Sequence, residues 1–266
     1  MLEERENRSP TWQRFAEGHR RLTPPLSPSA GDVETARRAI AEAGPRVVLF
    51  GMTPALAGLG EDLTAFDHSQ DVIDTVWPGD GAARRAVLAD WLSLGEEVGR
   101  FDAALGDGAL NSVGAALPEM MGVVARLLRP GGVAALRVFA APEEPETPDD
   151  IRRDVLGGWT GNLHALRWRL GMALAADRPG RVLPVREIVA AFDALFPDRQ
   201  MLAAATGWPR SEIDAVDLTR DADYALAFPP VSTFADLARR HFAEVRVVEA
   251  GGYPLAARCP TLLLRR

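Results

Sequence analysis

The sequence has a single cysteine, Cys259, and none of its apolar runs approaches the roughly 20 residues of a membrane-spanning helix. One thiol excludes a disulfide framework and a cysteine-rich zinc site. The first ten residues, MLEERENRSP, are too highly charged for the apolar stretch of a secretory signal peptide. We therefore predict a cytoplasmic protein that does not bind membranes.

Positive charge is also in short supply. The 266 residues carry 30 basic and 37 acidic side chains, which gives a formal net charge of −7. A surface that neutralises nucleic-acid phosphates is strongly basic, so this balance argues against a nucleic-acid partner. The four histidines are scattered without the spacing of metal ligands, and we predict no metal site.

What the chain does have is a regular alternation of short apolar runs and helical segments, in a composition that is 47% hydrophobic. Strands that alternate with helices form βαβ units in a mostly parallel sheet. Two further runs near the C-terminus follow each other around Gly251-Gly252 without a helix, which predicts an antiparallel hairpin. The predicted strands lie near 46–50, 63–66, 86–89, 103–105, 133–138, 245–248 and 261–264.

Helix signals fall between these strands. Asp32 is a predicted N-cap of a helix that Gly44-Pro45 ends, and Ser69 is a predicted N-cap of the next one. Thr53-Pro54 is a predicted N-cap and first helical residue directly after the first strand. A later helix is predicted to begin at Pro118 and to end at Gly131-Gly132.

The alternation stops at the acidic, proline-rich stretch APEEPETPDD, and roughly eighty residues with helical patterning follow. The predicted organisation is therefore an α/β, Rossmann-like core with a helical insertion and an N-terminal helical cap. Its parts are an N-terminal cap or lid at 1–31, a cofactor-binding core at 32–141, a helical insertion on the acceptor side at 142–230, and a helix with the hairpin at 231–266.

The residues that close the predicted strands include Gly51, Asp67, Asp90 and the run 106–108. In a doubly wound sheet, ligands bind beyond the carboxyl ends of the strands, so these residues are expected to meet in one crevice. A carboxylate after the second strand, such as Asp67, can accept hydrogen bonds from both hydroxyls of a ribose. Alternatively, Asp67 caps the helix that begins near Ser69.

Four stretches resemble segments of the class I S-adenosylmethionine-dependent methyltransferases. RVVLFG resembles the first motif, Asp67 in LTAFDHS matches the acidic residue that closes the second strand, and LADWLSL resembles the segment beside the adenine. FDAALGDG followed by LLRPGGVAALRVF resembles the fourth strand, the next helix and the fifth strand. The resemblance implies a seven-stranded sheet with a terminal antiparallel hairpin and S-adenosyl-L-methionine as cofactor.

The first loop departs from the family, which usually has several glycines there. Gly51 stands alone, before Met52-Thr53-Pro54. S-adenosylmethionine has no phosphate, so we expect one glycine to suffice for the close approach of the backbone. The predicted cofactor-binding residues are Gly51, Thr53, Asp67, His68, Asp90, Trp91, Asp107 and Gly108.

The sequence gives fewer signals for the residues that would contact the methyl acceptor. His164 lies in the predicted insertion and shares a helix face with Arg167 and Trp168, so it is a candidate general base, with Asp107 as a second candidate catalytic residue. The alternative for His164 is a half-buried histidine on an amphipathic helix. Tyr253, beside the Gly251-Gly252 turn, is expected either to face the acceptor or to pack.

These features favour a methyltransferase that transfers a methyl group to oxygen or nitrogen of a small molecule, in a chain that is a possible homodimer. Three alternatives stay open: a methyltransferase-like fold used for another reaction, a non-catalytic partner, and a nicotinamide enzyme. The last is disfavoured because G-x-G-x-x-G is absent from the first loop.

Overall fold

The computed structural model describes Gly18 and residues 22–266. Most of the predicted N-terminal cap, residues 1–31, therefore lies outside the described residues. No helix of the described part is long and apolar enough to cross a bilayer.

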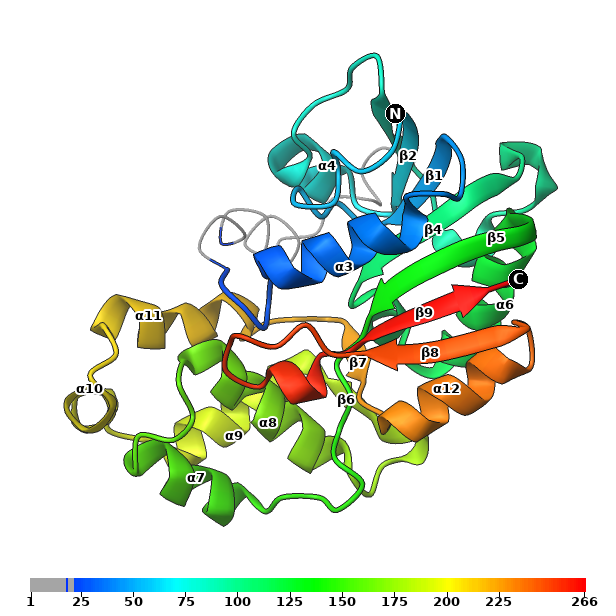
Figure 1. The fold of residues 1–266 in the computed structure, drawn as a ribbon. Helices are drawn as coiled ribbons and strands as arrows, with labels where there is room; N and C mark the ends of the chain where they lie inside the picture. Colours follow the sequence, from blue (N-terminus) through cyan, green and yellow to red (C-terminus); the bar gives the residue numbers. More distant parts are fainter. Residues whose placement is uncertain (1–17, 19–21) are drawn as a thin grey trace.

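A seven-stranded sheet forms the core of the molecule, with strand order β3-β2-β1-β4-β5-β9-β8 (Figure 1). Pairing is parallel from β3 through β5, whereas β9 is antiparallel to both β5 and β8. All seven predicted strands are confirmed, as is the antiparallel direction of the last. Their bounds are β1 Arg46–Phe50, β2 Asp62–Asp67, β3 Arg84–Leu88, β4 Phe101–Asp107, β5 Leu128–Arg137, β8 Glu244–Val248 and β9 Thr261–Arg265.

The apolar runs are buried on both faces because side chains alternate along a strand. Val47 and Leu49 of β1 face a cluster that includes residues of α3 (Ala30–Ile40) and α4 (Gln70–Val76). Val48 and Phe50 face the opposite cluster, which includes residues of α6 (Leu117–Leu127) and α12 (Val231–Arg239). Helices thus cover both faces of the sheet, with α3 in front of it and α6 behind it in Figure 1.

The caps of these helices correct one prediction and confirm another. Ser29, not Asp32, is the N-cap of α3, and Asp32 is the N3 residue whose carboxylate accepts the Ser29 N–H, which completes a capping box. Ser69 caps α4 as predicted, by accepting the Val72 N–H. Helix α6 ends at Leu127 and not at the glycine pair, because β5 already begins at Leu128.

The predicted helix at Pro54 is not present. Residues 53–59 form successive turns, in which Leu56 N–H donates to the carbonyl of Thr53 and Leu59 N–H to that of Leu56. Local cap chemistry was consistent with a helix, but the chain must return to β2 within a few residues, and β2 begins at Asp62. Thr53 therefore caps no helix.

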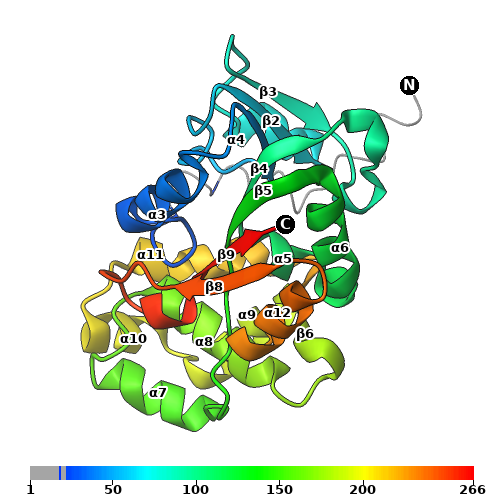
Figure 2. The same cartoon turned by 45° about the vertical axis from the view of Figure 1, so that its right-hand side comes forward.

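The segment after β5 forms a third apolar cluster beyond the end of the sheet, where it lies below the strands in both views (Figures 1 and 2). The helical character predicted for this segment is confirmed. A small antiparallel sheet within it, β6 Val182–Pro184 with β7 Ala225–Ala227, was not predicted. Its helices are α7 Pro148–Leu156, α8 Leu163–Ala175, α9 Val185–Leu195, α10 Arg199–Thr206 and α11 Arg210–Asp214.

Short helical turns complete the connections. The four-residue helix α5 (Ala109–Ser112) follows β4 directly. The 3-10 turns are η1 Trp91–Ser93, η2 Glu96–Val98, η3 Gly114–Ala116, η4 Pro179–Arg181, η5 Ala215–Thr219 and η6 Ala256–Arg258.

Candidate active site

A cavity of about 560 Å³ lies at the carboxyl ends of β1 to β4. Parallel strands end at the same edge of a sheet, which is why residues far apart in the sequence meet here. Seven of the eight predicted cofactor-binding residues line the cavity: Gly51, Thr53, Asp67, His68, Asp90, Trp91 and Asp107. Gly108 is not among the lining residues.

Asp67 is the last residue of β2 and is 8% exposed. Its Oδ1 accepts the Ser69 N–H at 2.9 Å, and His68 Nδ1 lies 3.7 Å from the same oxygen. Burial raises the pKa of Asp67 above its ordinary value, against the lowering effects of the Ser69 N–H and of His68. The alternative of a helix cap is wrong, because Ser69 is the N-cap of α4; Asp67 instead accepts the N–H of that cap residue with one of its carboxylate oxygens.

Gly51 follows β1 with φ +90°, a conformation that residues with a Cβ rarely adopt. A Cβ placed on Gly51 would lie 3.7 Å from the Trp91 ring, an ordinary van der Waals distance, so the positive φ and not the ring favours glycine here. The Trp91 indole donates from Nε1 to the carbonyl of Phe66 at 2.6 Å and meets Phe50 edge-on. The ring is therefore fixed beside the end of β1 and forms a flat, rigid wall of the cavity.

Asp90 lies outside β3 and caps the 3-10 turn η1, because its carboxylate accepts the Leu92 N–H at 3.0 Å. It is exposed, unlike Asp67. Asp90 and Trp91 both line the cavity, and their predicted place beside an adenine stays a prediction.

Asp107 closes β4 and is paired with Arg137 of β5, whose Nε donates to Oδ1 at 2.7 Å. Both side chains are buried. Burial raises the pKa of Asp107, although the charge of Arg137 opposes the shift. Arg137 also donates to the carbonyl of Pro25 and to the hydroxyl of Tyr253, so Tyr253 packs into this polar cluster.

The predicted acceptor residues lie elsewhere. His164 is on α8 and 5% exposed, and it is not among the residues that line the cavity. Trp168 packs between Phe139 and Phe228, with ring centroids 5.1 and 5.5 Å away. A role for His164 as general base stays a prediction, and the half-buried alternative understated its burial.

The sequence did not point to the rest of the lining. Arg137 does not line the cavity but holds Asp107, which does; it is a single charged residue inside the apolar run VAALRVFA, and that interruption was the available signal. Phe50 and Leu92 lie in the stretches RVVLFG and LADWLSL, whereas other lining residues bear no motif and come from segments that only the fold brings together. Among them are Leu22, Leu26, Ser112, Val113 and Tyr224.

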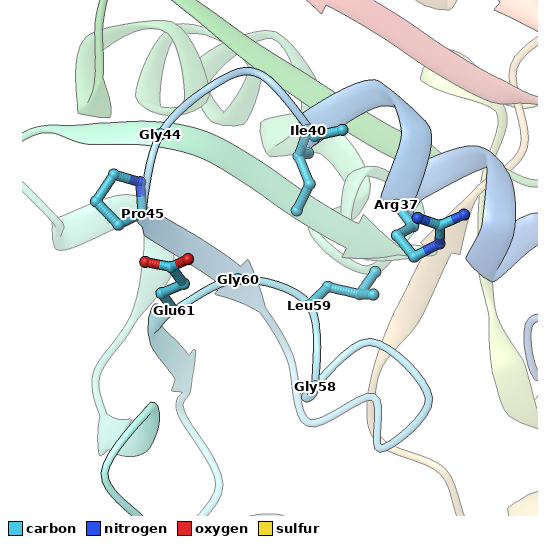
Figure 3. A pocket seen from close by; sticks show the side chains of 9 residues that line it. Arg37, Ile40, Gly44, Pro45, Gly58, Leu59, Gly60 and Glu61 are labelled. Carbon is cyan, nitrogen blue, oxygen red and sulfur yellow. The ribbon is translucent and has the colours of Figure 1, made fainter.

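A second hollow, of about 480 Å³, lies at the opposite end of the strands (Figure 3). Arg37 and Ile40 of α3 line one side of it, and Pro45 and Glu61, which precede β1 and β2, line the other. Because doubly wound sheets bind ligands at the carboxyl ends of their strands, this hollow is not the candidate site. Within the described part of the chain, no group of histidine, cysteine and acidic side chains could hold a metal ion.

Comparison with known proteins shows the fold. No protein-family model and no curated protein matches the chain. Its structure is similar to the CcbJ methyltransferase from Streptomyces caelestis, with 14% identity over 97% of this chain and 98% of that one and a TM-score of 0.54. It is similar to DhpI in a complex with SAH, with 12% identity over 96% and 92% and a TM-score of 0.53. It is also similar to a candidate Zn-dependent alcohol dehydrogenase from Rhodobacter sphaeroides, with 15% identity over 97% of each chain and a TM-score of 0.58.

The strand order separates the two kinds of fold that these neighbours' names suggest. The dinucleotide-binding fold has the order 3-2-1-4-5-6. Here the last strand, β9, enters antiparallel between β5 and β8. The chain therefore has the seven-stranded fold of the class I methyltransferases, as the sequence resemblance implied.

Proposed function

We propose that the protein is an S-adenosylmethionine-dependent methyltransferase that acts on a small molecule. The observation that supports this most directly is the cavity at the carboxyl ends of β1 and β2, where Gly51 and Asp67 lie side by side with the fixed ring of Trp91. An adenosine needs a flat apolar wall for its base and an acceptor for its ribose hydroxyls, and this arrangement supplies both.

In this proposal Asp67 accepts hydrogen bonds from the ribose diol with the carboxylate oxygen that Ser69 does not engage. Trp91 packs against the adenine, beside Asp90. The methionine part extends past Gly51 towards the end of β4, where Asp107 and Gly108 lie. Because Arg137 already balances the charge of Asp107, this end of the site is polar without a large net charge.

Methyl transfer is an in-line displacement at the sulfonium. The S–CH₃ bond breaks as the acceptor–CH₃ bond forms, S-adenosylhomocysteine leaves, and any proton on the acceptor passes to a base or to water. The residues of this chain need only align the two reactants and exclude water. Ser112, Val113 and Tyr224 line the cavity beyond β4, and we assign them to the acceptor.

Calorimetric titration with S-adenosylmethionine and S-adenosylhomocysteine tests the proposal without knowledge of the acceptor. Saturable binding of both, with no binding of NADH, is the expected result. Binding of NADH alone would support a nicotinamide enzyme, and binding of none of the three at millimolar ligand would contradict a cofactor site here.

A further inference from the structure

Arg167, in the second turn of α8, is a buried cation. It is 5% exposed, and its Nη2 donates to the hydroxyl of Thr219 at 2.9 Å. Its Nε has no hydrogen-bond partner among the described residues. A single neutral hydroxyl is a poor match for a guanidinium, which has five N–H donors.

The other buried arginines of the described chain are matched by acids. Arg137 pairs with Asp107, and Arg169, two residues further along α8, pairs with Glu146. Arg167 forms no ion pair with any described carboxylate. The same helix therefore carries one arginine built into an ion-pair network and one whose charge the described part of the fold leaves uncompensated.

An uncompensated buried charge is costly for a folded protein. Burial lowers the pKa of Arg167, yet a guanidinium remains protonated at neutral pH. Since an apolar side chain of similar size would avoid this cost, a functional reason for Arg167 is an anion that binds in its vicinity.

The surroundings of Arg167 connect it to the acceptor end of the cavity. Arg167 does not itself line the cavity, but Tyr224 does, and the charge of Arg167 opposes the effect of burial, which raises the pKa of that phenol. The next residue, Trp168, packs against Phe139, which follows β5 at the same edge of the sheet. By strand order, this region lies on the far side of β4 from Asp67 and Trp91.

We propose that Arg167 recognises a carboxylate on the acceptor, which enters beside Tyr224 and pairs with the guanidinium. A carboxylate fits because its two oxygens match two parallel N–H donors of an arginine. The inference rests on the proposed function, since it assigns the chemical class of the methyl acceptor as a small organic acid.

The test measures the melting temperature of the protein with acetate, benzoate and 2-naphthoate, each beside its uncharged amide at equal ionic strength. Each series is run with and without saturating S-adenosylhomocysteine. We expect at least one acid to raise the melting temperature where its amide does not. Because cofactor binding is measured separately in the same samples, failure of the cofactor site and failure of the acid site give different results.

Substitution identifies the residue. Arg167→Met removes the charge and keeps an unbranched apolar side chain, so the melting temperature without ligand should hold or rise while affinity for the acid falls roughly ten- to hundredfold. Arg167→Lys keeps the charge without the fork and should retain part of that affinity. The matched control, Arg169→Met, should lower the melting temperature, because Glu146 and Asp154 lose their partner.

Two results would overturn the inference. One is the absence of any acid-specific rise in the parent, with or without S-adenosylhomocysteine. The other is an Arg167→Met variant that keeps the parent's response, or that loses as much stability as Arg169→Met, which would make Arg167 a structural residue.

Discussion

Asp67 takes part in a local turn and, in the proposed function, also binds the ribose of the cofactor. Its Oδ1 accepts the Ser69 N–H in the turn that leads into α4, and the residue lines the cavity. A carboxylate has lone pairs enough for both roles. Loss of the side chain is therefore expected to reduce cofactor affinity more than it disturbs the turn.

The affinity prediction compares two substitutions. Asp67→Ala should weaken S-adenosylhomocysteine binding by on the order of 2–4 kcal/mol, because two charge-assisted hydrogen bonds are lost. Asp67→Asn should retain part of the affinity, since its amide oxygen still accepts. Calorimetry on both variants, with melting curves to show that they are folded, checks this. Parent-like affinity in both would mean that the ribose is not held by Asp67.

The pH dependence of binding follows from the raised pKa of Asp67. The ribose hydroxyls donate to the ionised carboxylate, so affinity should be full above that pKa and fall as the pH drops through it. Asp67→Asn should flatten this dependence. Because His68 Nδ1 lies 3.7 Å from Asp67, His68→Gln is the necessary control and should leave the dependence in place. A flat profile in the parent between about pH 4 and 8 would contradict the prediction.

Gly51 is constrained by its backbone before any ligand is considered. Because its φ is +90°, Gly51→Ala should lower the free energy of unfolding by about 1–2 kcal/mol, as measured by urea unfolding without ligand. Gly58→Ala is the matched control, since its φ is not positive and a Cβ there meets nothing within 4 Å. Gly51→Val is unsuitable as a probe of cofactor binding, because the strain at this φ would be confused with lost binding.

At the scale of elements, Arg199 joins three helical segments of the insertion. It pairs with Asp193 of α9, with Asp214 at the end of α11, and with Asp217 of η5, at 2.8 to 2.9 Å. The hydrogen bonds from Arg199 are the largest cause that lowers the pKa of Asp217, to about 2. One arginine at the start of α10 thus connects α9, α11 and η5 through ion pairs.

Because the pKa of Asp217 is lowered, the sign of the pH effect on stability is fixed. A carboxylate whose pKa is lowered on folding stabilises the fold above its unfolded pKa, here 3.8, and the contribution is lost as the pH falls towards 2. Urea midpoints measured from about pH 6 to pH 3 should fall more steeply in the parent than in Arg199→Met. The pKa values of Asp67 and Asp107 are raised, so these carboxyl groups change stability with pH in the opposite direction. Both groups are present in the parent and in the variant, so their effects cancel in the comparison. Parallel curves would show that the network contributes nothing.

Among the helices and strands, the sequence predicts best those features that depend on a local pattern of residues. The strands are predictable because apolar runs such as RVVLF are buried on both faces of the sheet, and Ser69 is predictable because a cap acts within three residues. The prediction of a helix at Pro54 was wrong, because the chain must reach the start of β2 within a few residues, and this constraint overrides a favourable cap. Correspondingly, Thr53→Ala should change stability by less than about 0.5 kcal/mol and not by the roughly 1 kcal/mol of a lost cap.

The residues of the candidate site also fall into two groups, those that a local pattern predicts and those that it does not. Gly51, Asp67 and Asp107 are predictable because they close strands, and parallel strands end at one edge. Arg137 and Tyr224 are not, because their contacts with the site join segments separated by 30 residues or more, as in the pairing of Arg137 with Asp107. No periodicity encodes such pairs.

At the scale of the whole molecule, the sheet and the helical segment meet at the cavity. The proposed cofactor-binding residues come from the strand ends, whereas Tyr224 comes from the segment beyond β5. The sheet order, with β9 antiparallel between β5 and β8, defines the fold, and the position of the cavity at the carboxyl edge defines where a ligand belongs. The proposed function therefore depends on where S-adenosylmethionine binds.

A crystal structure with S-adenosylhomocysteine measures this directly. We expect ligand density at the carboxyl edge of the sheet, with both ribose hydroxyls within hydrogen-bond distance of Asp67 and the adenine against Trp91. Density in the hollow beside Arg37 and Glu61, or a ribose turned away from Asp67, would contradict it.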